Sequence, residues 1–111
     1  MTGFDHGLSE RTLDTLASLF GKYSGIRRAV LYGSRAAGAA RDASDIDVTL
    51  FTDGAFTESD LIRLYGDLDD SDIPYAVDIS MYDNLRDSGL RRHIQSAGKV
   101  LFAREQEEAQ R

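Results

Sequence analysis

Two aspartates placed one residue apart, Asp45 and Asp47, are the residues best suited to chemistry in this chain. They stand at the head of a run in which Ile46, Val48 and Leu50 alternate with period two, a pattern typical of a β-strand. Residues i and i+2 of a strand point to the same face, so both carboxylates emerge side by side. Two anions that close repel each other unless a cation lies between them, and Mg²⁺ prefers hard oxygen ligands. The pair therefore predicts a divalent-metal site.

A glycine turn precedes this pair by a fixed spacing. Gly33-Ser34 is followed by ten residues and then by Asp45. The turn ends an apolar run at 29–31 and leads into a short alanine-rich stretch, which indicates a strand, a turn and a helix N-terminus. That arrangement binds phosphate oxygens. Gly33-Ser34 alone is an ordinary turn, but a phosphate site facing a carboxylate pair indicates metal-dependent chemistry on a nucleotide.

A third aspartate, Asp78, lies in the apolar stretch 75–80. Alternation places Val77 and Ile79 on one face of that strand and Asp78 on the other. Consecutive strands pair or neighbour about two-thirds of the time. If the strands at 45–51 and 75–80 are neighbours, three carboxylates converge on one side of the sheet; the alternative is a solvated strand aspartate.

The elements that must position these residues follow from periodicity and end signals. Helix 8–21 is expected to start at Ser9 as N-cap, and helix 58–68 at Thr57. The inner side of helix 58–68 is predicted to carry Leu61, Ile62, Leu64, Tyr65 and Leu68. The remaining expected elements are strands at 28–32, 45–51, 75–80 and 100–102 and helices at 34–39 and 83–97. Helices interspersed with strands indicate an α/β (α+β) fold.

Composition narrows the class of protein. A chain of 111 residues with 41% hydrophobic and 29% charged residues suits one compact domain spanning 1–111, with a core at about 26–102 and a charged tail at 103–111. No cysteine is present, so thiolate metal sites are excluded. The net charge of −6 disfavours extended nucleic acid as a partner. Neither a membrane span nor a signal peptide is apparent, so a cytoplasmic location is expected.

Three segments together resemble a known family. Gly33-Ser34-Arg35-Ala36-Ala37-Gly38, Ser44-Asp45-Ile46-Asp47-Val48 and Val77-Asp78-Ile79 are similar to the motifs of the minimal nucleotidyltransferases of the polymerase β superfamily. The resemblance covers roughly residues 26–102. The chain departs from many relatives at Ala37, where they carry a second arginine.

This resemblance implies a nucleotidyltransferase fold, a small mixed β-sheet flanked by helices, with two Mg²⁺ ions and ATP as substrate. It implies that Asp45 and Asp47 hold the metals and that Asp78 completes the site and helps activate the attacking hydroxyl. Gly33 and Ser34 are implied to contact the β- and γ-phosphates, with Arg35 nearby.

The resemblance also implies a partner. Minimal nucleotidyltransferases of this subgroup are commonly antitoxins paired with an all-helical HEPN ribonuclease toxin, and they silence it by transferring AMP from ATP to one of its tyrosines. An acidic surface suits a basic, RNA-cleaving partner. Two alternatives stay open: neutralisation of the toxin by binding without catalysis, and adenylylation of a small-molecule hydroxyl.

Overall fold

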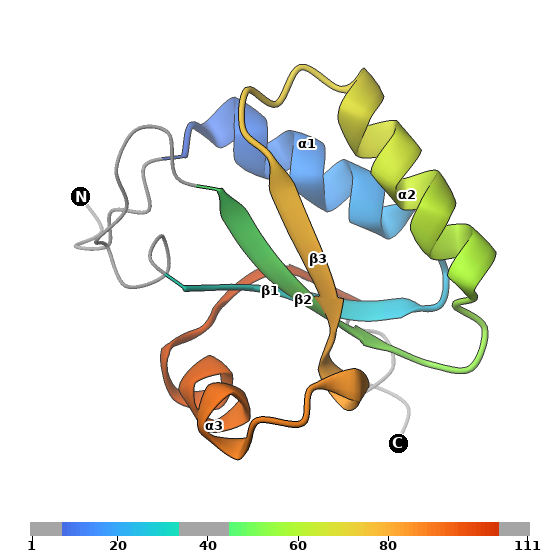
Figure 1. Ribbon diagram of the computed structural model, residues 1–111. Coiled ribbons are helices and arrows are strands. Elements are labelled where there is room, and N and C mark those ends of the chain that lie inside the picture. Colours follow the sequence, from blue (N-terminus) through green and yellow to red (C-terminus); the bar gives the residue numbers. More distant parts are fainter. Residues whose placement is uncertain (1–7, 34–44, 105–111) are drawn as a thin grey trace.

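The computed structural model describes residues 8–33 and 45–104, which form helices packed on a four-stranded sheet (Figure 1). The elements in chain order are α1 (Glu10–Gly21), β1 (Ile26–Tyr32), β2 (Ile46–Thr52), α2 (Glu58–Asp70), β3 (Val77–Met81), the 3₁₀ turn η1 (Tyr82–Asn84), α3 (Ser88–Ala97) and β4 (Lys99–Ala103).

The sheet is mixed, with strand order β3-β2-β1-β4. β1 pairs antiparallel with β2 and with β4, whereas β2 and β3 run parallel. Parallel strands need a crossover connection, and α2 supplies it between β2 and β3. The predicted small mixed sheet flanked by helices is confirmed, and the expected last strand at 100–102 is part of β4.

Helices cover both faces of the sheet (Figure 1). α1 and α2 pack on one face, and α3 lies against the other. Alternation along β1 and β2 sends Leu31, Ile46, Val48 and Leu50 to the α1/α2 face, where each is at most 1% exposed. The alternate side chains of β2 point to the α3 face, and at one end of the sheet they can therefore be polar.

The first two helices begin where their cap residues predict. The Ser9 side chain accepts a hydrogen bond from the Thr12 backbone N–H. Thr57 and Asp60 form a reciprocal capping box, in which each side chain accepts from the other residue's backbone N–H. These bonds satisfy backbone donors that the first helical turn leaves without a partner.

The inner side of α2 is narrower than its apolar residues suggest. Leu64 and Leu68 are buried, but Ile62 is 70% exposed and Tyr65 is 36% exposed. The prediction that Ile62 and Tyr65 face the core is therefore wrong. A helix packed on one side of a sheet buries a single stripe, and five apolar residues within eight positions spread beyond it.

The predicted helix 83–97 starts later, at Ser88. Leu85 is extended, and the Asp87 side chain caps α3 by accepting from the N–H groups of Gly89 and Leu90. Tyr82 in η1 stacks on Phe51 at 4.3 Å between ring centroids, which fixes the turn before the helix can begin. Gly89 therefore lies in the first turn of α3.

α3 is held to the sheet by a column of stacked side chains. The Arg28 guanidinium lies 4.3 Å from the Phe51 ring centroid, and the Arg91 guanidinium lies 4.5 Å from that of Tyr82. Phe51 and Tyr82 stack between the two arginines. The predicted helix 34–39 and residues 105–111 of the predicted tail lie outside the described residues.

Candidate active site

Two of the predicted site aspartates lie directly opposite each other on neighbouring strands. Asp47 of β2 and Asp78 of β3 are partners in the parallel register. Partnered residues on adjacent strands share a face, so both side chains emerge on the side opposite the α1/α2 core. Tyr32 of β1 is the partner of Asp47 on its other side, so the row Tyr32–Asp47–Asp78 crosses three strands.

Asp47 is repelled by its acidic neighbours. Partial burial raises the pKa of Asp47 above its ordinary value, and the charges of Asp78 and Asp45 raise it further. Asp45 is exposed immediately before β2 begins and is close enough to contribute to that effect. The charges of Asp45 and Asp78 both act on Asp47.

Gly33 approaches the same carboxylate from the end of β1. Its φ of +79° lies in the left-handed region, which favours glycine. A Cβ atom at this position would lie 2.7 Å from Asp47 Oδ2, so only a residue without a side chain fits. The turn and the carboxylate are therefore adjacent, as a phosphate-and-metal site requires. Ser34 and Arg35, the other predicted phosphate contacts, lie outside the described residues.

The donor chemistry of the acids suits a hard divalent cation. Asp45, Asp47 and Asp78 offer only carboxylate oxygens, which are the ligands that Mg²⁺ takes. A cation between Asp47 and its acidic neighbours would offset the repulsion that raises the Asp47 pKa. Within residues 8–33 and 45–104, no three acidic, histidine or cysteine side chains are already gathered closely enough to hold a metal ion.

Polar groups next to the acids extend the same face of the sheet. Ser80 lies two residues after Asp78 on β3, and its Oγ is 3.5 Å from the Tyr32 hydroxyl oxygen. Thr49, fully buried beside Asp47 on β2, donates from its Oγ1 to the Ser80 carbonyl oxygen at 3.4 Å. The sequence did not single out these neighbours, because their partners are set only by strand pairing.

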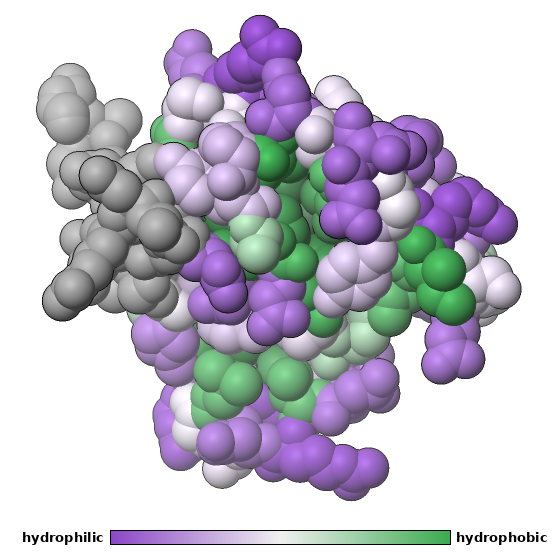
Figure 2. Space-filling view, turned by 45° about the horizontal axis from the view of Figure 1, so that its top comes forward, coloured by the Kyte–Doolittle hydropathy of each residue, from purple (hydrophilic) through white to green (hydrophobic). Residues whose placement is uncertain are grey.

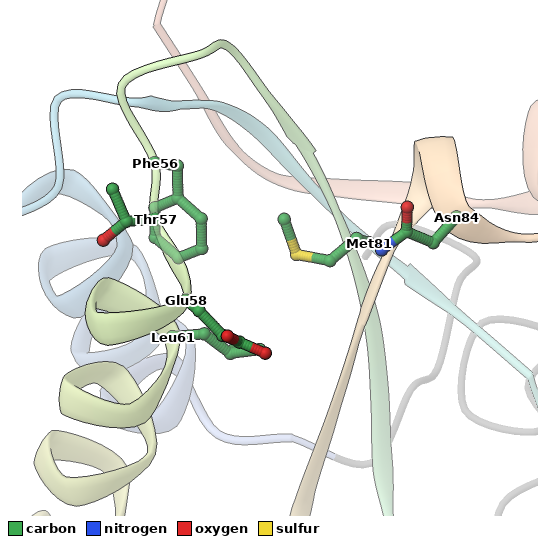
Figure 3. A pocket seen from close by; sticks show the side chains of 6 residues that line it. All are labelled: Phe56, Thr57, Glu58, Leu61, Met81 and Asn84. Carbon is green, nitrogen blue, oxygen red and sulfur yellow. The ribbon is translucent and has the colours of Figure 1, made fainter.

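A separate pocket opens on the α2 side of the sheet, at the other end of β3 (Figure 3). It has a volume of about 250 Å³, and Met81 points from β3 toward Phe56 and Leu61 across it. Asn84, Thr57 and Glu58 complete the lining. Asp47 and Asp78 do not line this pocket. In the view of Figure 2, hydrophobic surface is broken up by hydrophilic side chains.

The class of protein follows from its similarity to a known family. The family model for "Polymerase beta, Nucleotidyltransferase" matches residues 14–107, so the chain belongs to this nucleotidyltransferase family. The resemblance seen in the sequence motifs is confirmed. No curated protein matches the chain.

Solved structures show the same fold at low sequence identity. One chain of a toxin–antitoxin complex crystallised with AMP-PNP has a TM-score of 0.67 and 19% identity, over 87% of this chain and 77% of that chain. A chain of the MntA–HepT toxin–antitoxin complex has a TM-score of 0.55 and 17% identity, over 91% and 78%. A tri-AMPylated Shewanella oneidensis HEPN toxin in complex with MNT antitoxin matches with a TM-score of 0.56 and 17% identity, over 92% and 78%.

Proposed function

We propose that this chain is a Mg²⁺-dependent nucleotidyltransferase that transfers AMP from ATP to a tyrosine hydroxyl of a HEPN ribonuclease toxin and thereby acts as its antitoxin. Asp45, Asp47 and Asp78 are the proposed catalytic and metal-binding residues. Gly33, Ser34 and Arg35 are the proposed contacts to the triphosphate.

The observation that carries the proposal is the row Asp47–Asp78 with Gly33 against it. Two carboxylates are partners on neighbouring strands, and the glycine backbone leaves no room for a side chain beside Asp47 Oδ2. A structural role for this arrangement leaves its cost unexplained, because Asp78 and Asp45 both disfavour the charged form of Asp47. A site that takes a divalent cation and a polyphosphate accounts for both features.

The proposed reaction is an in-line displacement at the α-phosphorus of ATP. The tyrosine oxygen forms a bond to this phosphorus, the bond to the bridging oxygen breaks, and pyrophosphate leaves. When bound, two Mg²⁺ ions would neutralise the triphosphate and orient the attacking and leaving oxygens. Asp45 and Asp47 would hold these ions, and Asp78 would accept the hydroxyl proton through its position beside Asp47.

The choice of a toxin as acceptor rests on the structural neighbours and on charge. Proteins of this fold occur in toxin–antitoxin complexes, one with AMP-PNP and one with a tri-AMPylated HEPN toxin. The net charge of −6 suits a basic partner that cleaves RNA.

AMP transfer can be tested by combining this chain with a HEPN toxin as the proposed acceptor. The purified pair is incubated with α-labelled ATP and Mg²⁺, and the toxin is analysed by mass spectrometry for added AMP units. We expect labelling with the wild-type chain and a loss of at least about a hundredfold in rate with Asp47→Asn, because a metal-binding carboxylate is removed. Asp69→Asn, which removes an exposed aspartate from α2, is the matched control and should label normally.

Full labelling by both Asp45→Asn and Asp47→Asn would contradict the proposed site. RNA cleavage by the toxin, measured in the same reactions, separates catalysis from binding. Neutralisation that survives both substitutions while labelling is lost would show that the antitoxin acts by binding alone.

A further inference from the structure

The strand that carries Asp78 lies at the edge of the sheet. β3 pairs only with β2 among the described strands, so one side of its backbone has no neighbouring strand. Ile46 donates its N–H to the Ala76 carbonyl oxygen at 2.8 Å, which directs the groups of alternate residues, Asp78 included, toward β2. The N–H and C=O of Ile79, the residue after Asp78, therefore point outward. An edge strand with open groups is held in place less firmly than an inner strand.

One side chain from α2 closes this edge. The Tyr65 hydroxyl oxygen accepts a hydrogen bond from the Ile79 N–H at 3.0 Å and donates one to the Ile79 carbonyl oxygen at 3.3 Å. A hydroxyl can donate and accept at once, so it substitutes here for the peptide group of a missing strand. Tyr65 is 36% exposed, so its ring contributes less to the core than Leu64, which is fully buried one residue earlier.

The helix that carries Tyr65 is itself well anchored. Leu64 is 0% exposed and Leu68 is 7% exposed, and both belong to the core between the sheet and α1/α2. The capping box of Thr57 and Asp60 fixes the start of the same helix. Tyr65 thus connects a well-anchored helix to Ile79, the edge residue that directly follows Asp78.

We propose that Tyr65 is a positioning residue that holds Asp78 level with Asp47 by fixing the outer edge of β3 at Ile79. The consequence for the site rests on the proposed function, because Asp78 must serve the transfer reaction. Tyr65 touches neither acid, so it acts through the β3 backbone. Since side chains alternate along a strand, even local loosening at Ile79 changes where Asp78 points.

The test compares two substitutions that each remove one hydroxyl. Tyr65→Phe removes the two bonds to Ile79. Tyr23→Phe is the matched control, because the Tyr23 hydroxyl donates to Asp67 Oδ2 of α2 at 2.6 Å and not to the β3 backbone. Hydrogen exchange of the Ile79 amide is measured by NMR in the free chain, and kcat and the KM for ATP are measured with the toxin as acceptor.

We expect Tyr65→Phe to accelerate exchange of the Ile79 amide and to lower kcat by roughly 3- to 10-fold, the factor that corresponds to one ordinary hydrogen bond. The KM for ATP should change little, because Gly33 and Asp47 keep their places. Tyr23→Phe should lower the unfolding temperature without changing the Ile79 exchange or kcat. In an Asp78→Glu background, the further effect of Tyr65→Phe on kcat should shrink, because the two residues act through one position.

Ile79 exchange that is no faster in Tyr65→Phe than in Tyr23→Phe would overturn the inference, whether or not AMP is transferred. An equal loss of kcat in the two variants would also overturn it, because the effect would then follow stability alone. Absence of AMP transfer in the wild type, with fast Ile79 exchange confined to Tyr65→Phe, would leave the edge contact standing and reject the proposed function.

Discussion

At Asp47, folding favours the neutral carboxyl group, whereas the proposed metal binding needs the ionised one. Burial and the charges of Asp78 and Asp45 raise its pKa, so the ionised form opposes folding at neutral pH. At a pH below the ordinary aspartate pKa the group is protonated in both states and the penalty is absent. The penalty grows as pH rises from that value through the raised pKa of the folded state.

We therefore expect Asp47→Asn to raise the free energy of unfolding at pH 7 and to leave it unchanged near pH 3. Urea unfolding at the two pH values measures this difference. Asp69→Asn is the control for the change in net charge. A variant that is less stable than the wild type at pH 7 would contradict the repulsion inferred from the geometry.

Cation binding gives a second readout on the same residue. At ten times its Kd, Mg²⁺ should stabilise the wild-type chain by about 1.4 kcal/mol. Asp47→Asn should lose this gain, since the central carboxylate of the group is gone. Thermal unfolding with and without Mg²⁺ measures both effects, and an equal Mg²⁺ shift in the two proteins would place the cation elsewhere.

Gly33 is the second residue at which the backbone restricts the side chain. Gly33→Ala should destabilise the fold by about 1–2 kcal/mol, because an alanine resists the left-handed conformation. It should also displace the Asp47 carboxylate, since the new Cβ would meet Oδ2 at 2.7 Å. AMP transfer should fall by more than the loss of folded protein explains, as measured by labelling at a temperature where both proteins are folded.

Gly54→Ala is the matched control for that substitution. An added Cβ at Gly54 meets nothing within 4 Å. Labelling by Gly33→Ala at the rate of Gly54→Ala would show that the close approach to Asp47 has no part in catalysis.

At the scale of elements, α1 and α2 are joined by a charged hydrogen bond. Tyr23, just after α1, donates to Asp67 of α2, and Lys22 donates to the same carboxylate oxygen at 2.9 Å. These bonds lower the pKa of Asp67, and burial together with Asp67 raises the pKa of Tyr23 to about 12. Stability from the Asp67 carboxylate is present above its ordinary pKa and is lost as pH falls through the lowered one.

The stability that Tyr23 contributes depends on pH in the opposite direction. The stability that its neutral form contributes is complete below pH 10.0, the ordinary tyrosine value, and is lost as pH rises from there through about 12. Tyr23→Phe should be less stable than the wild type at pH 8, and the difference should shrink by pH 12. Chemical unfolding followed by circular dichroism measures it, and a difference that stays constant over this range would contradict the assignment.

The local sequence pattern predicted most helices and strands, but not the distant residues that each of them contacts. Ser9 and Thr57 marked helix starts correctly, because a cap is a contact between near neighbours in sequence. The true start of α3 was missed, because Tyr82 stacks on Phe51, which lies far away in the chain. Tyr65 was assigned to the core on its apolar ring, and its hydroxyl contact with Ile79 has no signature in sequence.

For the whole molecule, net charge should govern how fast the partner is met. If the partner is the basic toxin that we propose, a chain of net charge −6 attracts it over long range, and dissolved salt screens that attraction. We expect association to slow by roughly ten- to a hundredfold between 50 mM and 500 mM NaCl, with little change in dissociation. Stopped-flow or surface-based kinetics measure both rates, and a salt-independent association rate would contradict a basic partner.

No described helix is long and apolar enough to span a membrane. The helices α1 and α2 cover one face of the sheet, and Asp47 and Asp78 lie on the other face. The two aspartates are near the first residues of β2 and β3, at the opposite end of these strands from the stacked side chains of Arg28, Phe51, Tyr82 and Arg91.

The order of residues was enough to predict the chemical groups of the site: carboxylates spaced by one residue on an alternating strand, and a glycine turn ahead of them. These are properties of neighbours along the chain, where the period of a strand decides which side chains share a face. Three contacts became visible only in the folded chain: Asp78 is the partner of Asp47 in a parallel strand pair, Gly33 lies against the same carboxylate, and Tyr65 closes the edge of β3. Those contacts join residues 14 to 31 positions apart, and the packing of the whole sheet and its helices selects their register.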